Sequence, residues 1–420
     1  MAIERGLGAG GVSEEVAVQE AIMQNIVELP QQPGVTEFTD GSAVIGEFEM
    51  PQEMPPQVPF DGNLAEVIDE ADLGRISSDL VGSIDDDLAS REDWEDTYKT
   101  GLEFLGMKTE ERTEPFEGSS GVIHPLLAES VTQFQAQAYR ELLPATGPVR
   151  TSVIGAQNEM LVKQSERVKD YMNYMITYRM EEYDPELDQM LFYLPVVGST
   201  FKKVYFDPLK QRAVSKFIHA EDLIVPYGAV DLASSPRITH RIMMDSNEVR
   251  KMQLVGFYRD IDLPISSEGS SYQVDEVEES INEIQGVHPS GPSTELMLYE
   301  VHTTLDIPGF EDMGIDGQTT GLKLPYIVTI IADSGDVLSV RRNYTEIDPI
   351  KSAKQYFVHY KFLPGLGFYG LGLTHMIGGL AQASTSILRQ LIDAGTLSNL
   401  PAGFKARGAR IRDEDNPLQP

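Results

Sequence analysis

The chain has no cysteine among its 420 residues. This absence excludes disulfide bonds, cysteine nucleophiles and thiolate metal sites, and it fits assembly in a reducing cytoplasm. The sequence also has no run of 18 or more apolar residues, so we expect no helix that spans a membrane. Its first residues lack the apolar stretch of a secretory signal, so we expect no export signal.

Basic residues are scarce. The chain carries 33 Lys and Arg against 66 Asp and Glu, a formal net charge of −33. Residues 1–117 hold 28 acidic side chains and 6 basic ones, so most of the acidic excess lies in the first part of the chain. Because neutralisation of phosphates supplies most non-specific affinity for DNA, we expect any contact with a duplex to be weak, local or transient.

The usual catalytic motifs are also missing. The stretch from Gly198 to Lys203 resembles a phosphate loop but lacks the G-x-x-x-x-G-K-[ST] spacing. No two histidines are three or four residues apart, and no H-E-x-x-H or G-x-S-x-G motif occurs. A Ser-His-Asp triad needs only proximity in space, so the sequence leaves that arrangement open. The motifs identify no active site and no cofactor, and we expect a protein that is not an enzyme.

One acidic run, Asp85-Asp86-Asp87, offers an alternative as a metal site. A charge run at a helix start more often interacts with the helix dipole and faces solvent. A metal-dependent hydrolase that uses clustered carboxylates therefore stays as the enzyme alternative, to be tested by metal titration and by alanine replacement of this run.

Patterning divides the chain into five segments of an α+β protein with mixed sheets and long helices. The first is a Gly-, Pro- and Glu-rich arm, extended or disordered, which is either a solvated tail or orders against a capsid or a neighbouring subunit. An acidic helical segment follows, then an α+β core with helices before strands, an acidic surface insertion, and a β-rich segment that leads into a long helix and a basic loop. The five segments are 1–60, 61–117, 118–258, 259–294 and 295–420.

Three helices are expected in the core. The first opens at His124-Pro125, and its apolar residues predict a single buried face. The second covers 158–180 and carries a methionine-containing stripe that predicts core packing rather than a cofactor site. A shorter helix begins at Asp184-Pro185. The apolar positions of the first two are Leu127, Val131, Phe134, Ala138 and Leu142, then Leu161, Val168, Met172 and Met175-Ile176.

Strands are expected from β-branched and aromatic runs. A hairpin-like pair turns at Ser334-Gly335, and a short helix is expected at 247–255. The expected strands are 201–206, 213–218, 239–244, 295–305, 324–332, 337–342 and 356–362, and residues 220–227 are expected to form a loop that enters another short strand.

A glycine-rich corner at 364–372 precedes a long apolar helix over 373–391 that is expected to stop at Asp393-Ala-Gly395. Gly370 and Gly372 predict a tight corner between close-packed backbones, although such a corner could also cradle an anion. Gly378 and Gly379 lie inside the helix and would let a neighbour approach closely, either within the subunit or between subunits.

The densest basic stretch follows that helix. In so acidic a chain it is a candidate contact with DNA or with an acidic partner, or else a solvated loop that answers the acidic residues at 413–415. Its members are Lys405, Arg407, Arg410 and Arg412.

Several blocks, in fixed order over about 290 residues, together resemble the portal proteins of tailed bacteriophages, in the group of the Salmonella podovirus. The acidic insertion is the main gap in this resemblance. The blocks are HPLLAES at 124–130, FQAQAYRELLP at 134–144, GP at 147–148, LD at 187–188, GSTFKKVYFDP at 198–208, AEDLIVPY at 220–227, RITH at 237–240, YGLG at 369–372, DAG at 393–395 and LPAG at 400–403.

The resemblance implies a homo-oligomeric ring of about twelve subunits at one capsid vertex, with a wing of α+β structure. In such rings double-stranded DNA passes non-specifically inward at packaging and outward at infection. The partners implied are the terminase large subunit, head-completion and tail proteins, and the capsid and scaffolding proteins. The implied location is the virion, after assembly in the host cytoplasm, with ATPase activity confined to the terminase.

Members of this family run longer than 420 residues, so we expect a piece of a longer portal. The alternative of another structural class is a capsid-associated adaptor or connector without a role in packaging, which ring stoichiometry and terminase binding would distinguish.

Overall fold

The computed structural model describes residues 35–37, 43–45, 58–107, 112–156, 158–208, 210–264, 276–287, 295–314 and 318–399. The chain forms two compact units, 1–57 and 58–420. In the first unit, β1 (Val35–Glu37) and β2 (Ala43–Ile45) pair antiparallel. The remainder of the arm expected at 1–60 lies outside the described residues, except 58–60, which belong to the second unit.

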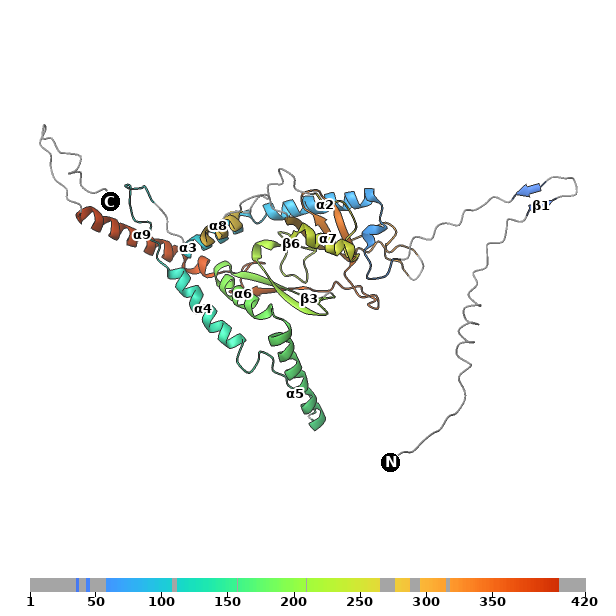
Figure 1. The fold of residues 1–420 in the computed structure, drawn as a ribbon, viewed down its shortest axis with the longest axis horizontal. Coiled ribbons are helices and arrows are strands. Elements are labelled where there is room, and N and C mark those ends of the chain that lie inside the picture. The colour runs from blue at the N-terminus through green and yellow to red at the C-terminus, as the bar shows by residue number, and fades with distance from the viewer. Residues whose placement is uncertain are drawn as a thin grey trace, which may run out of the picture. The chain divides into compact units, whose positions relative to one another are not determined.

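Two antiparallel sheets organise the described part of the second unit (Figure 1), and with its helices they make the α+β class that the sequence predicts. The sheets were expected to be mixed, and that part of the prediction is wrong, because every strand pair in them is antiparallel. The five-stranded sheet has the order β5-β6-β7-β8-β9 and the three-stranded sheet the order β10-β3-β4. Their bounds are β3 Ser199–Asp207, β4 Arg212–Ile218, β5 Leu223–Ile224, β6 Arg237–Asp245, β7 Glu295–Leu305, β8 Leu324–Ile331, β9 Val337–Arg342 and β10 Phe357–Lys361.

Helix α2 (Glu70–Ala89) packs against the five-stranded sheet because its apolar residues recur by three and four. Leu73, Ile76, Leu80 and Ile84 are buried together with residues of β8 and β9. The Ser77 hydroxyl donates to the carbonyl of Gly335 at 2.5 Å, in the turn between those strands. Gly335 has a φ of +75°, which confirms the hairpin expected there.

A second core surrounds β3, and five helices contribute to it or pack beside it. They are α3 (Glu92–Phe104), α4 (Leu126–Leu142), α6 (Tyr183–Val197), α8 (Glu276–Gln285) and α9 (Leu373–Asn399). Val277 of α8 is only 1% exposed, so the described part of 259–294 is not merely the surface insertion that the sequence suggests. Helix α7 (Ser246–Leu254) buries Val249 beside the five-stranded sheet.

Two helices bury less than their periodicity predicts. Helix α4 buries Leu127 and Val131, but Leu142 is 49% exposed. Helix α5 (Glu159–Tyr174), which continues through a π turn at Met175–Arg179, buries no residue at all. The prediction that its methionine stripe lies in the core is therefore wrong, because periodicity reports an apolar face and not whether anything covers that face.

Helix α9 runs through Asp393–Gly395 to Asn399, so the expected stop is also wrong. The buried Asp393 carboxylate accepts the backbone N–H of Ser120 at 2.7 Å. This tertiary contact holds the helical turn at the point where the local sequence favours an end.

Candidate functional site

Three glycines bring the corner before α9 against the corner between α6 and β3. Gly198 ends α6 with a φ of +90°. A Cβ on Gly370 would lie 2.4 Å from the Gly198 carbonyl oxygen, and one on Gly372 would lie 2.5 Å from that of Val196. The Gly370 N–H donates to the Ser199 hydroxyl at 2.7 Å. The glycines thus position the start of α9, and this close backbone packing accounts for them without a bound anion.

Farther along, α9 is fixed to the segment that precedes α4. Besides the Asp393 contact, the Thr385 hydroxyl accepts the N–H of His124 at 3.1 Å, and Arg389 Nε donates to the Val122 carbonyl at 2.7 Å. On the same side, a Cβ on Gly378 would lie 3.3 Å from the ring of Phe104, whereas one on Gly379 would meet nothing within 4 Å. The glycine pair in the helix therefore divides between a packed side and an open one.

The open side of α9 carries an apolar row that we name the α9 stripe. Its members follow one another by three or four residues, as a helix face requires, and each is exposed, Leu380 by 62%, Ile387 by 67% and Leu391 by 70%. Arg389 and Asp393 supply the helix with its two Lys, Arg, Asp or Glu side chains, and both bond to residues 120–122. The α9 stripe consists of Met376, Leu380, Ala383, Ile387 and Leu391.

Helix α5 offers a second exposed apolar surface, the α5 face. Figure 1 shows α5 directed away from both sheets. Hydrogen bonds join α5 to the extended segment after α4, where Asn173 bonds to both backbone groups of Val149. The α5 face is made of Met160, Leu161, Val168, Tyr171, Met172 and Tyr174, each between 43% and 74% exposed.

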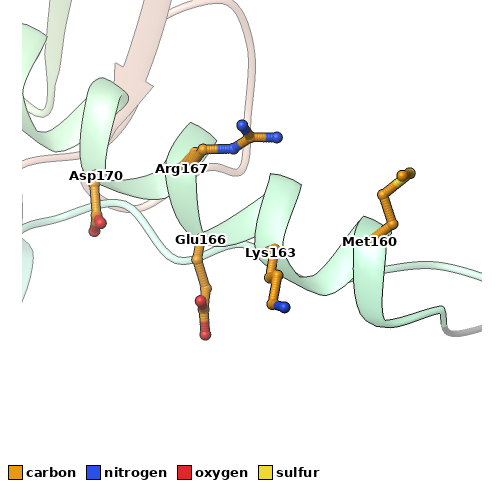
Figure 2. A pocket seen from close by; sticks show the side chains of 5 residues that line it. All are labelled: Met160, Lys163, Glu166, Arg167 and Asp170. Carbon is orange, nitrogen blue, oxygen red and sulfur yellow. The ribbon is translucent and has the colours of Figure 1, made fainter.

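A charged side of α5 meets this face at Met160. A depression of about 430 Å³ lies along it, lined by Met160, Lys163, Glu166, Arg167 and Asp170. Figure 2 shows Lys163, Glu166 and Asp170 on one side of the helix and Met160 and Arg167 on the other. Small-molecule sites are enclosed by several elements. Because all five of these side chains come from one helix, the depression is an open surface and not a binding site.

A buried ion cluster joins the two sheets. Lys203 Nζ of β3 lies 2.6 and 2.7 Å from the two carboxylate oxygens of Glu300 on β7, and His302 Nε2 lies 2.8 Å from Glu300 Oε1. Burial raises the pKa of Glu300, but Lys203 and His302 outweigh that effect and hold the pKa well below its usual value. Burial also lowers the pKa of His240 to about 3, and the Lys203 charge adds to the effect.

This cluster has no room for a substrate. The cavity beside His302 holds about 60 Å³, far below the roughly 300–1,000 Å³ of small-molecule sites. The pairing of Lys203 with Glu300 was not predicted, because the two residues are 97 positions apart in the sequence. The available signal was the position of Glu300 in β7, a charged residue flanked by Tyr299 and Val301. Their arrangement is that of a structural ion pair between sheets.

The carboxylate run at 85–87 does not assemble into a metal site. Asp87 is buried and pairs with Arg237, whose Nη2 lies 2.5 Å from Asp87 Oδ2, while Asp85 and Asp86 are exposed. Burial raises the pKa of Asp87, with Arg237 opposing that shift. Within the described ranges, no three His, Asp or Glu side chains are arranged to hold a metal ion.

The basic residues Lys405, Arg407, Arg410 and Arg412 lie outside the described residues. None of the helices in the described ranges has both the length and the apolarity to cross a bilayer. No family model matches the chain, and no curated protein is significantly similar to it. The exposed faces of α5 and α9 are therefore the features of the described structure that most directly suggest a function.

Proposed function

We propose that the chain is a subunit of a portal-type ring, a structural channel for double-stranded DNA at one vertex of a phage capsid. The observation that carries this proposal is the pair of exposed apolar faces on α5 and α9 in a chain whose net charge is −33. An apolar face of this extent on a helix marks an interaction surface. A ring that is built from one kind of subunit uses two different faces of that subunit, repeated at every contact.

The charge distribution supports a conduit rather than a tight DNA binder. Affinity for a duplex rises with the number of phosphates that Lys and Arg neutralise. A chain with twice as many acidic as basic side chains lets DNA slide instead of holding it. In this proposal the terminase large subunit supplies ATP hydrolysis, and head-completion and tail proteins later take its place on the ring.

The portal family is proposed because the sequence blocks between residues 124 and 403 resemble, in the same order, those of tailed-phage portal proteins. The glycine corner fits a constructional role for one of these blocks, since YGLG at 369–372 and the glycine of GSTFKK at 198–203 lie in backbone contact. The ion pair between Lys203 and Glu300 fits a rigid α+β body that bears mechanical load during packaging.

Native mass spectrometry and negative-stain imaging of residues 1–420 test the ring. We expect closed particles of about twelve subunits with a central hole. A protein that stays monomeric over a wide range of concentration and salt, or that stops at a closed dimer, would overturn the ring. Weak duplex binding that does not depend on sequence, and co-purification with a terminase large subunit, test the conduit, and tight binding to one DNA sequence would contradict it.

A further inference from the structure

Helices α5 and α9 share an electrostatic property that α2 and α3 lack. Helix α5 carries three acidic and three basic side chains, and α9 carries one of each, so both are neutral. By contrast, α2 has six acidic side chains and one basic one, and α3 has five and one. Two copies of so acidic a chain repel each other where acidic surfaces such as those of α2 and α3 approach. The two neutral faces are where copies approach without that repulsion.

The two faces also differ in relief. The α9 stripe is aliphatic and has a recess between its large side chains, because Ala383 belongs to it and Gly379, beside it, leaves open space where a Cβ would stand. The α5 face is high, because Tyr171 and Tyr174 stand out from it, 63% and 50% exposed. Tyrosine is enriched at the centres of interfaces, where its ring fills a recess and its hydroxyl reaches water. A raised aromatic face fits an aliphatic stripe that has a recess better than it fits a copy of itself.

The two apolar rows have similar lengths, about 22 Å from Met376 to Leu391 and about 21 Å from Met160 to Tyr174, although the helices that carry them differ in length. Helix α9 has 27 residues and therefore spans about 40 Å. Helix α5 has 16 residues, and its π turn adds five more, which together span about 30 Å. Neither helix gains enough from propensity alone to stay formed in water, since most helical stability in proteins comes from packing of the apolar face.

We propose that the α9 stripe of one copy of this chain packs against the α5 face of the next copy. This inference rests on the proposed function, because a closed ring needs two different faces of each subunit to meet. The occupant of the α9 stripe is thus a second copy of the chain, and the contact is heterologous.

Site-directed crosslinking tests the pairing. Because the chain has no native cysteine, the reagent reacts with the introduced cysteines alone. We would prepare Ile387→Cys and Val168→Cys as separate proteins of different mass, mix them, and add a short bismaleimide. The expected product is a crosslinked pair that contains one of each protein, with no product from either protein alone. A chain that carries both cysteines should give a ladder that extends to the full ring.

The control replaces Val168→Cys by Glu166→Cys, on the charged side of α5, and should give no product with Ile387→Cys. Self-crosslinking of Ile387→Cys alone would overturn the inference, because it would pair α9 with α9. Rings that form without any crosslink between positions 168 and 387 would overturn the inference and leave the proposed function intact. Monomers without crosslinks would overturn both.

Charge substitution gives a second measurement. Ile387→Glu and Tyr171→Glu should each weaken assembly by about thirtyfold or more, the size of a hot-spot change. Circular dichroism should stay unchanged, because both side chains are exposed in the isolated subunit. Full assembly of either variant would contradict the proposed contact.

Discussion

The backbone of Gly370 lies directly against that of Gly198. A Cβ on Gly370 would stand 2.4 Å from the Gly198 carbonyl oxygen, and a Cβ on Gly198 would stand 2.3 Å from that of Gly370. Two corners of the chain, about 170 residues apart, therefore meet with no space for a side chain on either one. The start of α9 is fixed by this contact.

Gly370→Ala should lower the free energy of unfolding by about 2–4 kcal/mol, because the new methyl group clashes with rigid backbone. Urea denaturation followed by tryptophan fluorescence is suited to this test. The single tryptophan, Trp94, stacks on Tyr369 with ring centroids 4.2 Å apart. The matched control is Gly379→Ala, where a Cβ meets open space. It should raise stability by up to about 1 kcal/mol, and equal losses in the two variants would refute a local clash.

Lys203→Met should destabilise the protein by about 3–5 kcal/mol, because it leaves the Glu300 carboxylate buried without its cation. Urea titration at pH 7 measures the loss. Adding Glu300→Gln to Lys203→Met should recover part of it, since the second change removes the uncompensated charge. A double variant that is no more stable than Lys203→Met would show that the pair does not act as a unit.

Stability should fall as the pH drops below about 6.5. Burial lowers the pKa of His240 and of His359 to about 3 in the folded chain, with help from Lys203 and Lys361 respectively. Unfolded histidine titrates near 6.5, so between these values the unfolded chain binds more protons than the folded one. Each histidine then contributes a loss of about 1.4 kcal/mol per pH unit.

Urea titrations at several values between pH 7 and pH 5 would measure this slope. His240→Gln and His359→Gln should each reduce the slope by one proton's share, and the double variant by two. A slope that is unchanged in the double variant would assign the acid sensitivity to other groups.

Asp393→Ala should loosen the far half of α9 and residues 119–124 together, because Ser120 loses the acceptor of its backbone N–H. The hydrogen bond to a charged group is worth about 1.5–3 kcal/mol. Hydrogen exchange read by mass spectrometry should show faster exchange in both segments and unchanged exchange in β7 and β8. Thr396→Val is the control, since the Thr396 hydroxyl bonds to Ile392 within the same helix. Faster exchange confined to α9 would contradict the coupling.

Salt should promote assembly. Charge repulsion between copies extends over about 30 Å at 0.01 M salt but only about 10 Å at 0.1 M salt. Screening does not weaken the apolar contact between the neutral faces, so light scattering should show a larger assembled fraction as the NaCl concentration rises. Disassembly on adding salt would mean that ion pairs, and not these faces, hold the copies together.

Strand positions followed closely from the sequence because β-branched and aromatic runs end at clear turn residues. The bounds of β7 and β9 agree with the prediction, and β3, β4 and β10 differ by one or two residues at their ends. The pairing of β10 with β3 could not be predicted, because that contact joins segments more than 150 residues apart.

Which helix faces are buried was harder to predict than where the strands lie. The rows on α5 and α9 have the same spacing as the buried row on α2, and spacing alone does not separate a covered face from an open one. The number of charged side chains separates α9 from α2, although it does not separate α5 from α2. The outer side of α2 is acidic. The two charged side chains of α9, Arg389 and Asp393, instead bond to residues 120–122. This difference was visible in the sequence, because the α9 stretch is nearly free of Lys, Arg, Asp and Glu.

The attachment of α9 at two places has a mechanical consequence. Its first turn is held by α6, where the Thr374 hydroxyl donates to the Val196 carbonyl at 2.8 Å, and its later turns hold the residues just before α4. Side-chain hydrogen bonds therefore join α9 to the end of α6 and to the residues just before α4. A displacement of α9 would act on both of these helix ends directly.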